Sequence, residues 1–198
     1  MSERSSTRRH VILQAALGCF AQHGVEATTI DMIRAASGAS TGSLYHHFGN
    51  KEHIAAEVYL EGLRRFRAVQ GAYLAPAQTL EEGIRAIVHA QVDWIVAEPD
   101  WAGYLFNHRG VLAQEGLEAD YRAELQGAQA PVATWFLARL PAGQRLRWPA
   151  DAYVALLVGP VHDYARHWLA GRRETPLAEL REFFADAACR AVGLAGPG

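Results

Sequence analysis

The chain has 198 residues, of which half are hydrophobic and a fifth are charged. This length allows one or two domains with a substantial core, and this composition excludes a disordered chain, a collagen-like repeat and a disulfide-rich secreted scaffold. The charge is uneven, because residues 1–68 hold 8 Lys and Arg against 6 Asp and Glu, whereas residues 69–198 hold 11 against 15. A mildly basic N-terminal part on an acidic remainder is typical of a segment that meets phosphate.

The two cysteines, Cys19 and Cys189, are too far apart in sequence to define a metal or redox motif, and they indicate a reducing compartment. No apolar run reaches the roughly 18 residues that a membrane span needs. Arg8-Arg9 and the apolar residues after them resemble an export signal, but Gln14 interrupts the run and its apolar positions follow a helical period. We therefore expect a cytoplasmic protein with no membrane segment.

The N-terminal part of the chain predicts short, well-capped helices. A first helix is expected to end before Gly24, where a glycine suits a helix C-cap. A second begins after Thr28 or Thr29 and ends near residue 37, and a third runs over about residues 40–47. A long helix capped by Asn50 then leads to a linker at residues 74–78.

Further helices are expected in the rest of the chain, and we expect no strand. Thr79 and Glu82 have the spacing of a capping box for a helix that stops before residue 99. The following helices are predicted from Asp100, over about residues 116–140 with a kink at Pro131, over 149–169 with a kink at Pro160, and from Thr175-Pro176 to about residue 192. The sequence thus predicts an all-α protein of about nine helices.

Residues 28–47 have the form of a helix, a glycine-containing turn and a short second helix. Gly38 suits a steep turn between two helices. The second helix has no acidic residue and begins with small donors and acceptors, which suits insertion into a major groove about 12 Å wide. A polar surface turn is the alternative interpretation of the same pattern.

The run from Gly38 to Glu52, GASTGSLYHHFGNKE, resembles the DNA-binding signature of the tetracycline-repressor (TetR) family. The resemblance covers about residues 9–58, and beyond them the chain agrees with the family only in length and helical organisation. It implies a three-helix helix-turn-helix head at residues 1–49 and a connecting helix and linker at 50–78. Residues 79–198 would then form a larger helical domain for ligand binding and dimerisation.

The resemblance also implies which residues meet double-stranded DNA. A threonine hydroxyl before the second helix and a lysine at the start of the fourth helix would contact phosphates. The small residues of the third helix would face base edges. The aromatic side chains of the third helix would contact phosphate or thymine methyl groups. Leu44 and Phe48 would pack inward. The candidate DNA-binding residues are Thr29, Ser40, Thr41, Gly42, Ser43, Tyr45, His46 and Lys51.

Three positions depart from the family pattern. Arg34 stands where the family usually has alanine, packed close to the third helix, while Ser37 and Ala39 replace the more usual alanine and valine. The Arg34 guanidinium either extends past this contact to the surface or holds the two helices slightly apart.

Histidines and carboxylates give no convincing metal pattern. His46 and His47 point about 100° apart on a helix, and His53 lies beyond a turn, so the three cannot easily share an ion. Asp163 and His167 have helical i, i+4 spacing, for which a surface or interface ion pair is the simpler interpretation. We expect no metal and no cofactor.

All five tryptophans lie in residues 79–198. Aromatic residues at helical spacing usually form a core, but some could line a cavity for a small apolar or aromatic molecule, with histidines as its polar contacts. The candidate ligand-binding residues are Trp94, Trp101, Tyr104, His108, Trp135 and His162.

The last two predicted helices carry apolar faces suited to a twofold four-helix interface. The alternative is that both faces pack within one chain. The candidate interface residues are Ala155, Gly159, Leu177, Leu180 and Phe184.

The sequence as a whole predicts a homodimeric transcriptional regulator, a repressor that leaves a palindromic operator when a small molecule fills its cavity. One alternative is a DNA-binding protein of the same fold without an effector. Another is a helical enzyme or carrier with a vestigial helix-turn-helix, although no catalytic constellation or phosphate loop supports an enzyme.

Overall fold

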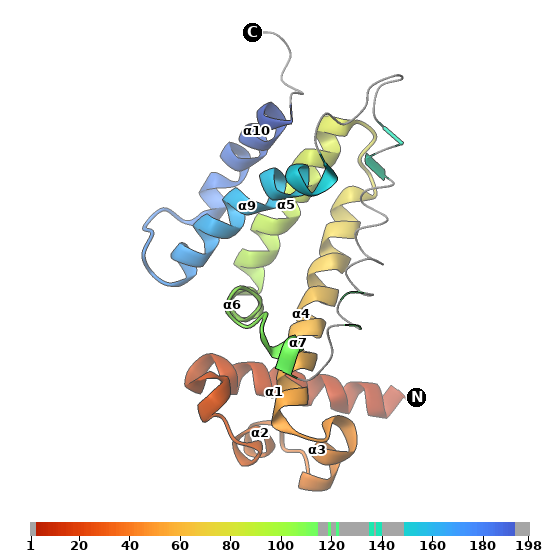
Figure 1. The fold of residues 1–198 in the computed structure, drawn as a ribbon, viewed down its shortest axis with the longest axis vertical. Coiled ribbons are helices and arrows are strands. Elements are labelled where there is room, and N and C mark those ends of the chain that lie inside the picture. Colours follow the sequence, from red (N-terminus) through yellow and green to blue (C-terminus); the bar gives the residue numbers. More distant parts are fainter. Residues whose placement is uncertain are drawn as a thin grey trace. The chain divides into compact units, whose positions relative to one another are not determined.

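The structure is a computed structural model that describes residues 3–114, 119, 122, 135–136, 138–139 and 149–192. Nine α-helices and one short 3₁₀ helix form the regular structure of these residues, and none of them lies in a strand (Figure 1). The all-α prediction is confirmed for this part of the chain. Most of the helix predicted over 116–140, including Pro131, lies outside the described residues.

The chain divides into two compact units, and α4 (Lys51–Leu74) contributes to both. Unit 1 consists of Met1–Arg64 and Asp100–Arg122, and unit 2 of Arg65–Pro99 and Ala123–Gly198. Besides α4, the described helices of unit 1 are α1 (Glu3–Ala27), α2 (Ile30–Ser37), α3 (Thr41–Phe48), α6 (Pro99–Asn107, whose first residue falls in unit 2) and α7 (Val111–Gln114). Those of unit 2 are α5 (Leu80–Ala97), α9 (Ala150–Leu169), η1 (Leu177–Leu180) and α10 (Arg181–Ala191).

Side-chain caps set the boundaries of the first helices. Gly24 has φ 78° and interrupts α1, as its predicted capping position requires. Thr29 rather than Thr28 caps α2, because its Oγ1 accepts the Met32 N–H at 3.2 Å. The Thr28 hydroxyl is instead buried and donates to the Gly24 carbonyl at 2.7 Å.

The turn between α2 and α3 has the predicted form. Gly38 ends α2 with φ 62°, a left-handed conformation that glycine adopts without strain. Ser40 then caps α3 by accepting the Ser43 N–H at 3.2 Å. At the start of α4, Asn50 accepts the His53 N–H at 2.6 Å, which confirms the predicted cap.

Aromatic packing joins α6 to α1 and α4 inside unit 1. The Tyr104 ring stacks on Phe20 at a centroid distance of 5.7 Å, and the Tyr104 hydroxyl donates to the Ala55 carbonyl at 2.9 Å. Gly62 lies so close to Trp101 that an added Cβ would be 3.0 Å from the indole. The segment that begins at residue 100 is therefore an integral part of the unit that contains the helix-turn-helix.

In unit 2, α5 packs against both α9 and α10 (Figure 1). The predicted capping box is present, since Glu82 accepts the Thr79 N–H at 3.0 Å and Thr79 accepts the Glu82 N–H at 3.2 Å. Buried Gln91 donates to the Leu157 carbonyl of α9 at 3.3 Å. Together these contacts fix α5 as the central helix of the described part of unit 2.

Two helix starts differ from the prediction. The sixth helix begins at Pro99 and not after Asp100, because proline is tolerated at a first helical position. The segment after Pro176 forms the 3₁₀ helix η1 before α10 begins, and no side chain caps it. Pro160 lies within α9, which continues on both sides of it.

Candidate nucleic-acid interface and effector region

The third helix presents its polar residues to solvent and its apolar residues to the core. Leu44 and Phe48 are buried at 1% and 3% exposure, as predicted. Thr41, Gly42 and His46 are exposed, Tyr45 is 54% exposed, and Ser43 is half-buried. This helix therefore offers hydroxyls, an accessible backbone and two aromatic rings, without any charged side chain that would repel phosphate.

The capping residues Thr29 and Ser40 are both exposed at the N-termini of α2 and α3. Each hydroxyl oxygen accepts one backbone N–H, which leaves its own proton available to a phosphate oxygen. The partial positive charge of a helix N-terminus favours an anion at the same place.

Lys51 lies half-buried at the start of α4, and its Nζ donates to the Glu26 carbonyl at the end of α1, at 2.9 Å. A carbonyl does not neutralise the ammonium, and an ammonium has two further donors. The bond holds the charge of Lys51 in one place beside the α1–α2 corner. The sequence had not predicted this contact.

Arg34, the main departure from the family pattern, is exposed, and its Nε pairs with Asp31 of the same helix at 3.1 Å. Its guanidinium therefore extends to the surface, the first of the two predicted outcomes. Buried Ala39 donates its N–H to the Ser37 hydroxyl at 3.3 Å, so both substituted positions take part in the turn.

The histidines of the helix-turn-helix region do not converge. His46 and His47 have ring centroids 5.3 Å apart, while His53 Nε2 lies 3.9 Å from Glu57. Asp163 of α9 pairs with Arg166 at 3.6 Å rather than forming the ion pair expected with His167. Within the described ranges, no group of three or more His, Cys, Asp or Glu is placed to hold a metal ion.

Three of the six ligand-binding candidates belong to unit 1. Trp101 is 1% exposed, and Tyr104 is 4% exposed with its hydroxyl already bonded to Ala55. The His108 ring lies 4.6 Å from the Tyr104 ring. Burial raises the pKa of the Tyr104 hydroxyl and lowers the pKa of the His108 imidazole, so both are neutral near pH 7.

The other three candidates, Trp94, Trp135 and His162, belong to unit 2. Trp94 packs against Phe66 of α4 at 5.2 Å. Trp135 lies on Gly83 at the start of α5, where an added Cβ would come within 2.2 Å of the indole, so that any larger residue would displace the ring. Burial lowers the pKa of His162 to about 4, helped by the nearby Arg166 charge.

Three buried polar side-chain atoms of α5 have no hydrogen-bond partner within the described structure: His89 Nε2, which lies 3.1 Å from Glu182, Gln91 Oε1 and Trp94 Nε1. Gln91 is 0% exposed, and Trp94 lies one turn further along the helix. Orphan polar atoms are rare in cores because each costs about 1–3 kcal/mol. Gln91 was not among the predicted ligand-binding residues, although a glutamine inside the apolar stripe of this helix is a visible signal in the sequence.

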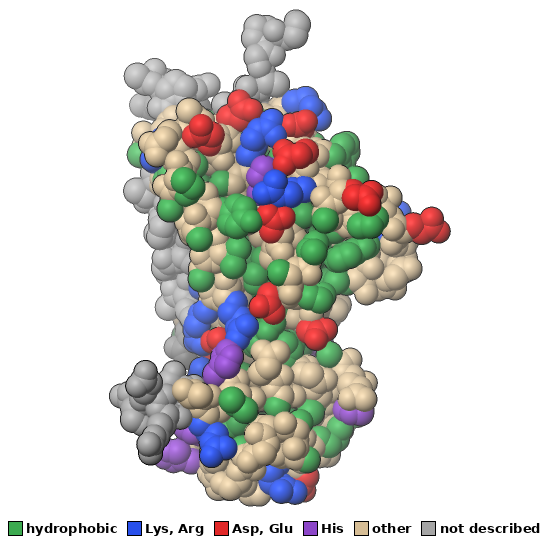
Figure 2. Space-filling view, turned by 180° about the vertical axis from the view of Figure 1, so that it is seen from behind, with side chains coloured by type: hydrophobic (Ala, Val, Ile, Leu, Met, Phe, Trp, Pro, Cys, Tyr) green, Lys and Arg blue, Asp and Glu red, His purple; other side chains and the backbone are tan. Residues whose placement is uncertain are grey.

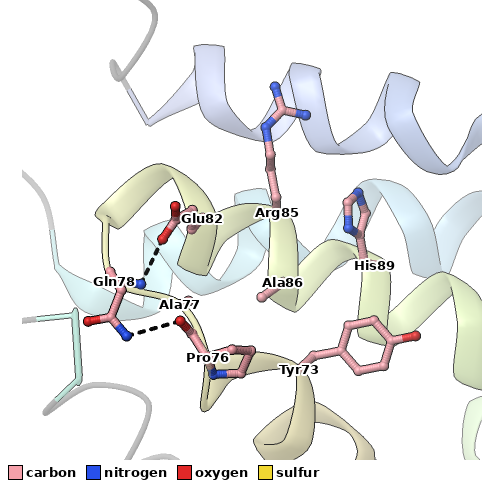
Figure 3. A pocket seen from close by; sticks show the side chains of 8 residues that line it. All are labelled: Tyr73, Pro76, Ala77, Gln78, Glu82, Arg85, Ala86 and His89. Carbon is pink, nitrogen blue, oxygen red and sulfur yellow. Dashed lines mark hydrogen bonds between the residues drawn. The ribbon is translucent and has the colours of Figure 1, made fainter.

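A pocket of about 360 Å³ lies where the end of α4 and the following linker meet α5. Figure 3 shows Tyr73 and Pro76 on one side of it, with Arg85 and His89 projecting from α5 on the other. At its rim, Arg85 pairs with Asp186 at 2.6 Å, and His89 Nε2 lies 3.1 Å from Glu182. Figure 2 shows Lys and Arg side chains beside Asp and Glu side chains in the upper part of the face that it presents.

The dimer candidates fall into two groups. Ala155 and Gly159 of α9 are exposed, and Leu180 is half-buried. Leu177 and Phe184 are 0% and 8% exposed because they pack in the core of unit 2. Large apolar side chains that remain on the surface of α9 and α10 are Val154, Leu156 and Phe183, with exposures of 43%, 45% and 59%.

No helix within the described ranges is both long and apolar enough to cross a membrane.

Comparison with known proteins shows what the helix-turn-helix part of the chain is similar to. Residues 12–58 match the model of the bacterial regulatory proteins of the tetR family. The transcriptional repressor AcnR of Corynebacterium glutamicum is 36% identical over 67 residues, which cover 34% of this chain and 36% of AcnR. The match thus spans about a third of the length of this relative.

Solved structures extend the likeness in fold to nearly the whole chain. A TetR family regulator from Marinobacter aquaeolei superposes with a TM-score of 0.78 at 21% identity, over 96% of this chain and 98% of that one. FadR of Bacillus subtilis, solved in complex with stearoyl-CoA, gives a TM-score of 0.73 at 14% identity, over 90% and 96%. Residues 12–58, which hold the capped helix-turn-helix, thus resemble bacterial regulatory proteins of the tetR family, and the chain shares its fold with these solved structures.

Proposed function

We propose that the protein is a homodimeric transcriptional repressor of the cytoplasm that releases a palindromic operator when a small apolar or aromatic effector binds. The observation that carries this proposal is α3, a short helix that exposes Thr41, Gly42 and Tyr45 while its apolar residues anchor it to the core. Two such helices, one from each protomer, would enter successive major grooves roughly 34–36 Å apart.

The DNA contacts that we propose divide into two kinds. Thr41, Ser43 and the backbone at Gly42 would read base edges, with His46 beside them, because small donors at the start of a helix reach the groove floor. Thr29, Ser40, Tyr45 and Lys51 would bind phosphates and so fix the position of the helix. The first group should control sequence preference and the second should control affinity.

The effector would bind in unit 2, where aromatic side chains and unsatisfied polar atoms occur together. Trp94 and Gln91 offer one donor and one acceptor that a ligand could satisfy. His162 is neutral at pH 7, so the candidate polar contacts carry no charge. The stearoyl chain bound by the FadR of B. subtilis supports an effector with an apolar body. Trp135, which lies on Gly83 of α5, is a further candidate for contact with it.

A second copy of the chain would pack on α9 and α10. Exposed Val154, Leu156 and Phe183 form the apolar part of the surface that we propose for it, and the small residues Ala155 and Gly159 would allow close approach of two helices. Leu180 would lie at the margin. Leu177 and Phe184, as residues of the intrachain core, would support this surface from behind.

Effector binding would reach the DNA through α4. This helix is continuous from Lys51, beside the proposed phosphate contacts, to Tyr73 near its other end. Tyr73 donates to Asp93 of α5 at 2.7 Å, and Arg181 of α10 holds the same carboxylate at 3.0 Å. An effector that displaces α5 would therefore tilt α4 and change the spacing of the two recognition helices.

The proposal is tested by selecting duplexes from a random pool with the purified protein and then adding effector candidates. We expect a palindromic site, bound by a dimer, and its release by members of a panel of aromatic and long-chain apolar compounds. Tryptophan fluorescence reports binding independently of release. Recovery of no enriched duplex would overturn the DNA-binding role, and tight binding of polyanionic metabolites alone would overturn the effector class. Binding without release would refute the coupling.

A further inference from the structure

The N-terminal part of α1 is fixed against the helix-turn-helix by Arg9. The guanidinium of Arg9 lies 5.7 Å from the centre of the Phe48 ring, at the end of α3, and it pairs with Glu57 of α4. Phe48 is buried and Glu57 is largely buried, so Arg9 faces the interior of unit 1. The residues on either side of Arg9 therefore have defined positions on α1.

Successive residues of an α-helix point about 100° apart, so Arg8 and His10 flank Arg9 on opposite sides. The His10 imidazole lies 3.9 Å from Glu61, which places α4 on that flank. Arg8 consequently lies on the other flank, away from Glu61. It is exposed, and no ion pair or hydrogen bond joins its side chain to another described residue.

Within the described structure, most other cations near the helix-turn-helix are neutralised by carboxylates, which sets the free charge of Arg8 apart. Among the described Lys and Arg side chains of α1 to α3 and the unit 1 part of α4, three are neutralised by carboxylates: Arg9 by Glu57, Arg34 by Asp31, and Arg64 by Glu57 and Glu61. The recognition helix α3 has no Lys or Arg at all. Lys51 and Arg8 are the two cations of this set whose charge is not compensated within the described structure.

We propose that Arg8 binds a phosphate of the DNA backbone from α1, outside the helix-turn-helix. This rests on the DNA-binding role proposed above. The packing of Arg9 on Phe48 keeps this part of α1 beside the end of α3, so a duplex seated on α3 continues past Arg8. An arginine fits the role because its planar guanidinium matches the geometry of a phosphate and keeps its charge at every physiological pH. The contact would add affinity and orientation without adding sequence preference.

The experiment measures the dissociation constant of the full-length protein for the duplex that it selects, between about 50 and 200 mM KCl. Each phosphate contact contributes about 0.9 to the slope of log affinity against log salt, so Arg8→Ala in both protomers should flatten the slope by about two. Arg8→Lys should keep most of the slope, because the charge remains. Sequence preference in the random pool should stay the same in both variants.

Arg172→Ala is the matched control, because Arg172 is an exposed arginine of unit 2 and its loss changes the net charge equally. An Arg8→Ala protein with the wild-type slope would overturn the proposal. A slope that flattens equally in the Arg172→Ala protein would also overturn it, since general charge and not a contact would then be the cause. If the wild-type protein selects no duplex, that result contradicts the proposed DNA-binding role itself, and it is distinguishable from a failure of the Arg8 contact alone.

Discussion

Helices α3 and α10 are both short and both amphipathic, yet their outward faces differ in chemistry. In α3, Leu44 is 1% exposed while its neighbour Tyr45 is 54% exposed and surrounded by hydroxyls and imidazoles. In α10, Phe184 is 8% exposed while its neighbour Phe183 is 59% exposed. Each helix thus pairs an inward apolar residue with an outward aromatic one.

The two helices differ in the exposed residues that surround the outward aromatic side chain. Around Tyr45 the exposed residues are Thr41, Gly42 and His46, which can donate to and accept from nucleic acid. On α9, the exposed large apolar residues are Val154 and Leu156, which gain only from exclusion of water. An exposed aromatic residue therefore indicates a partner, and its neighbours indicate which class of partner.

The largest effect is expected for the two phenylalanines of α10. Phe184→Glu places a carboxylate in the core of unit 2 beside the Tyr164 ring, which lies 5.8 Å from Phe184 in the native protein. We expect it to destabilise the fold by about 4 kcal/mol or more. Phe183→Glu, one residue away, should leave the unfolding free energy of the monomer nearly unchanged and instead abolish dimerisation. Urea denaturation and sedimentation velocity measure the two effects.

The same two variants also show which results would contradict the roles assigned to Phe183 and Phe184. A soluble dimer of Phe183→Glu with wild-type dissociation would place the interface away from this part of α10. A folded Phe184→Glu protein with wild-type stability would mean that the packing of α10 on α5 does not hold unit 2 together.

A somewhat smaller effect is expected for the equivalent pair in α3. Leu44→Ala removes buried methyl groups and should cost about 3 kcal/mol of unfolding free energy. Tyr45→Ala should leave stability unchanged and weaken binding of the selected duplex about a hundredfold, since each of two protomers loses a contact worth about 1.4 kcal/mol. Circular dichroism and fluorescence anisotropy follow the two quantities. Unchanged affinity of the Tyr45→Ala protein would exclude Tyr45 from the interface.

Local signals in the sequence were sufficient to predict the helix-turn-helix. Gly38 acts through its own left-handed conformation, and Ser40 and Asn50 act through bonds to residues three positions away, so their types alone indicate the turn and the two caps. The inward positions of Leu44 and Phe48 follow from helical periodicity for the same reason. The Thr79 capping box was predictable on this basis as well.

Contacts between distant residues could not be predicted in this way. The bond from Lys51 to the Glu26 carbonyl joins residues 25 positions apart, and nothing in the local pattern indicates it. Periodicity identifies Phe183 and Phe184 as apolar residues of one helix, but which of them faces α5 depends on how α10 is rotated against it. The orphan oxygen of Gln91 likewise becomes visible only when α9 is in place.

Histidines show the same contrast between the two units. His46 in α3 is exposed, so its imidazole meets water in the folded and the unfolded chain alike. His162 in α9 is largely buried, and burial together with the Arg166 charge lowers its pKa from the ordinary 6.5 to about 4. The unfolded chain therefore binds a proton at a pH where the folded chain does not.

This difference predicts that the protein loses stability as the pH falls. Below about pH 6.5 the unfolded chain gains a proton on His162, and the folded chain gains it only near pH 4. Between pH 7 and pH 5 we expect a loss of about 2 kcal/mol from this residue alone. The lowered pKa values of His89 and His108 act in the same direction, so some loss should persist without His162. Urea titrations at the two pH values should show a smaller loss of unfolding free energy in His162→Gln than in the wild type. If the loss in His162→Gln equals that of the wild type, His162 is not the buried neutral group from which the polar part of an effector site was inferred.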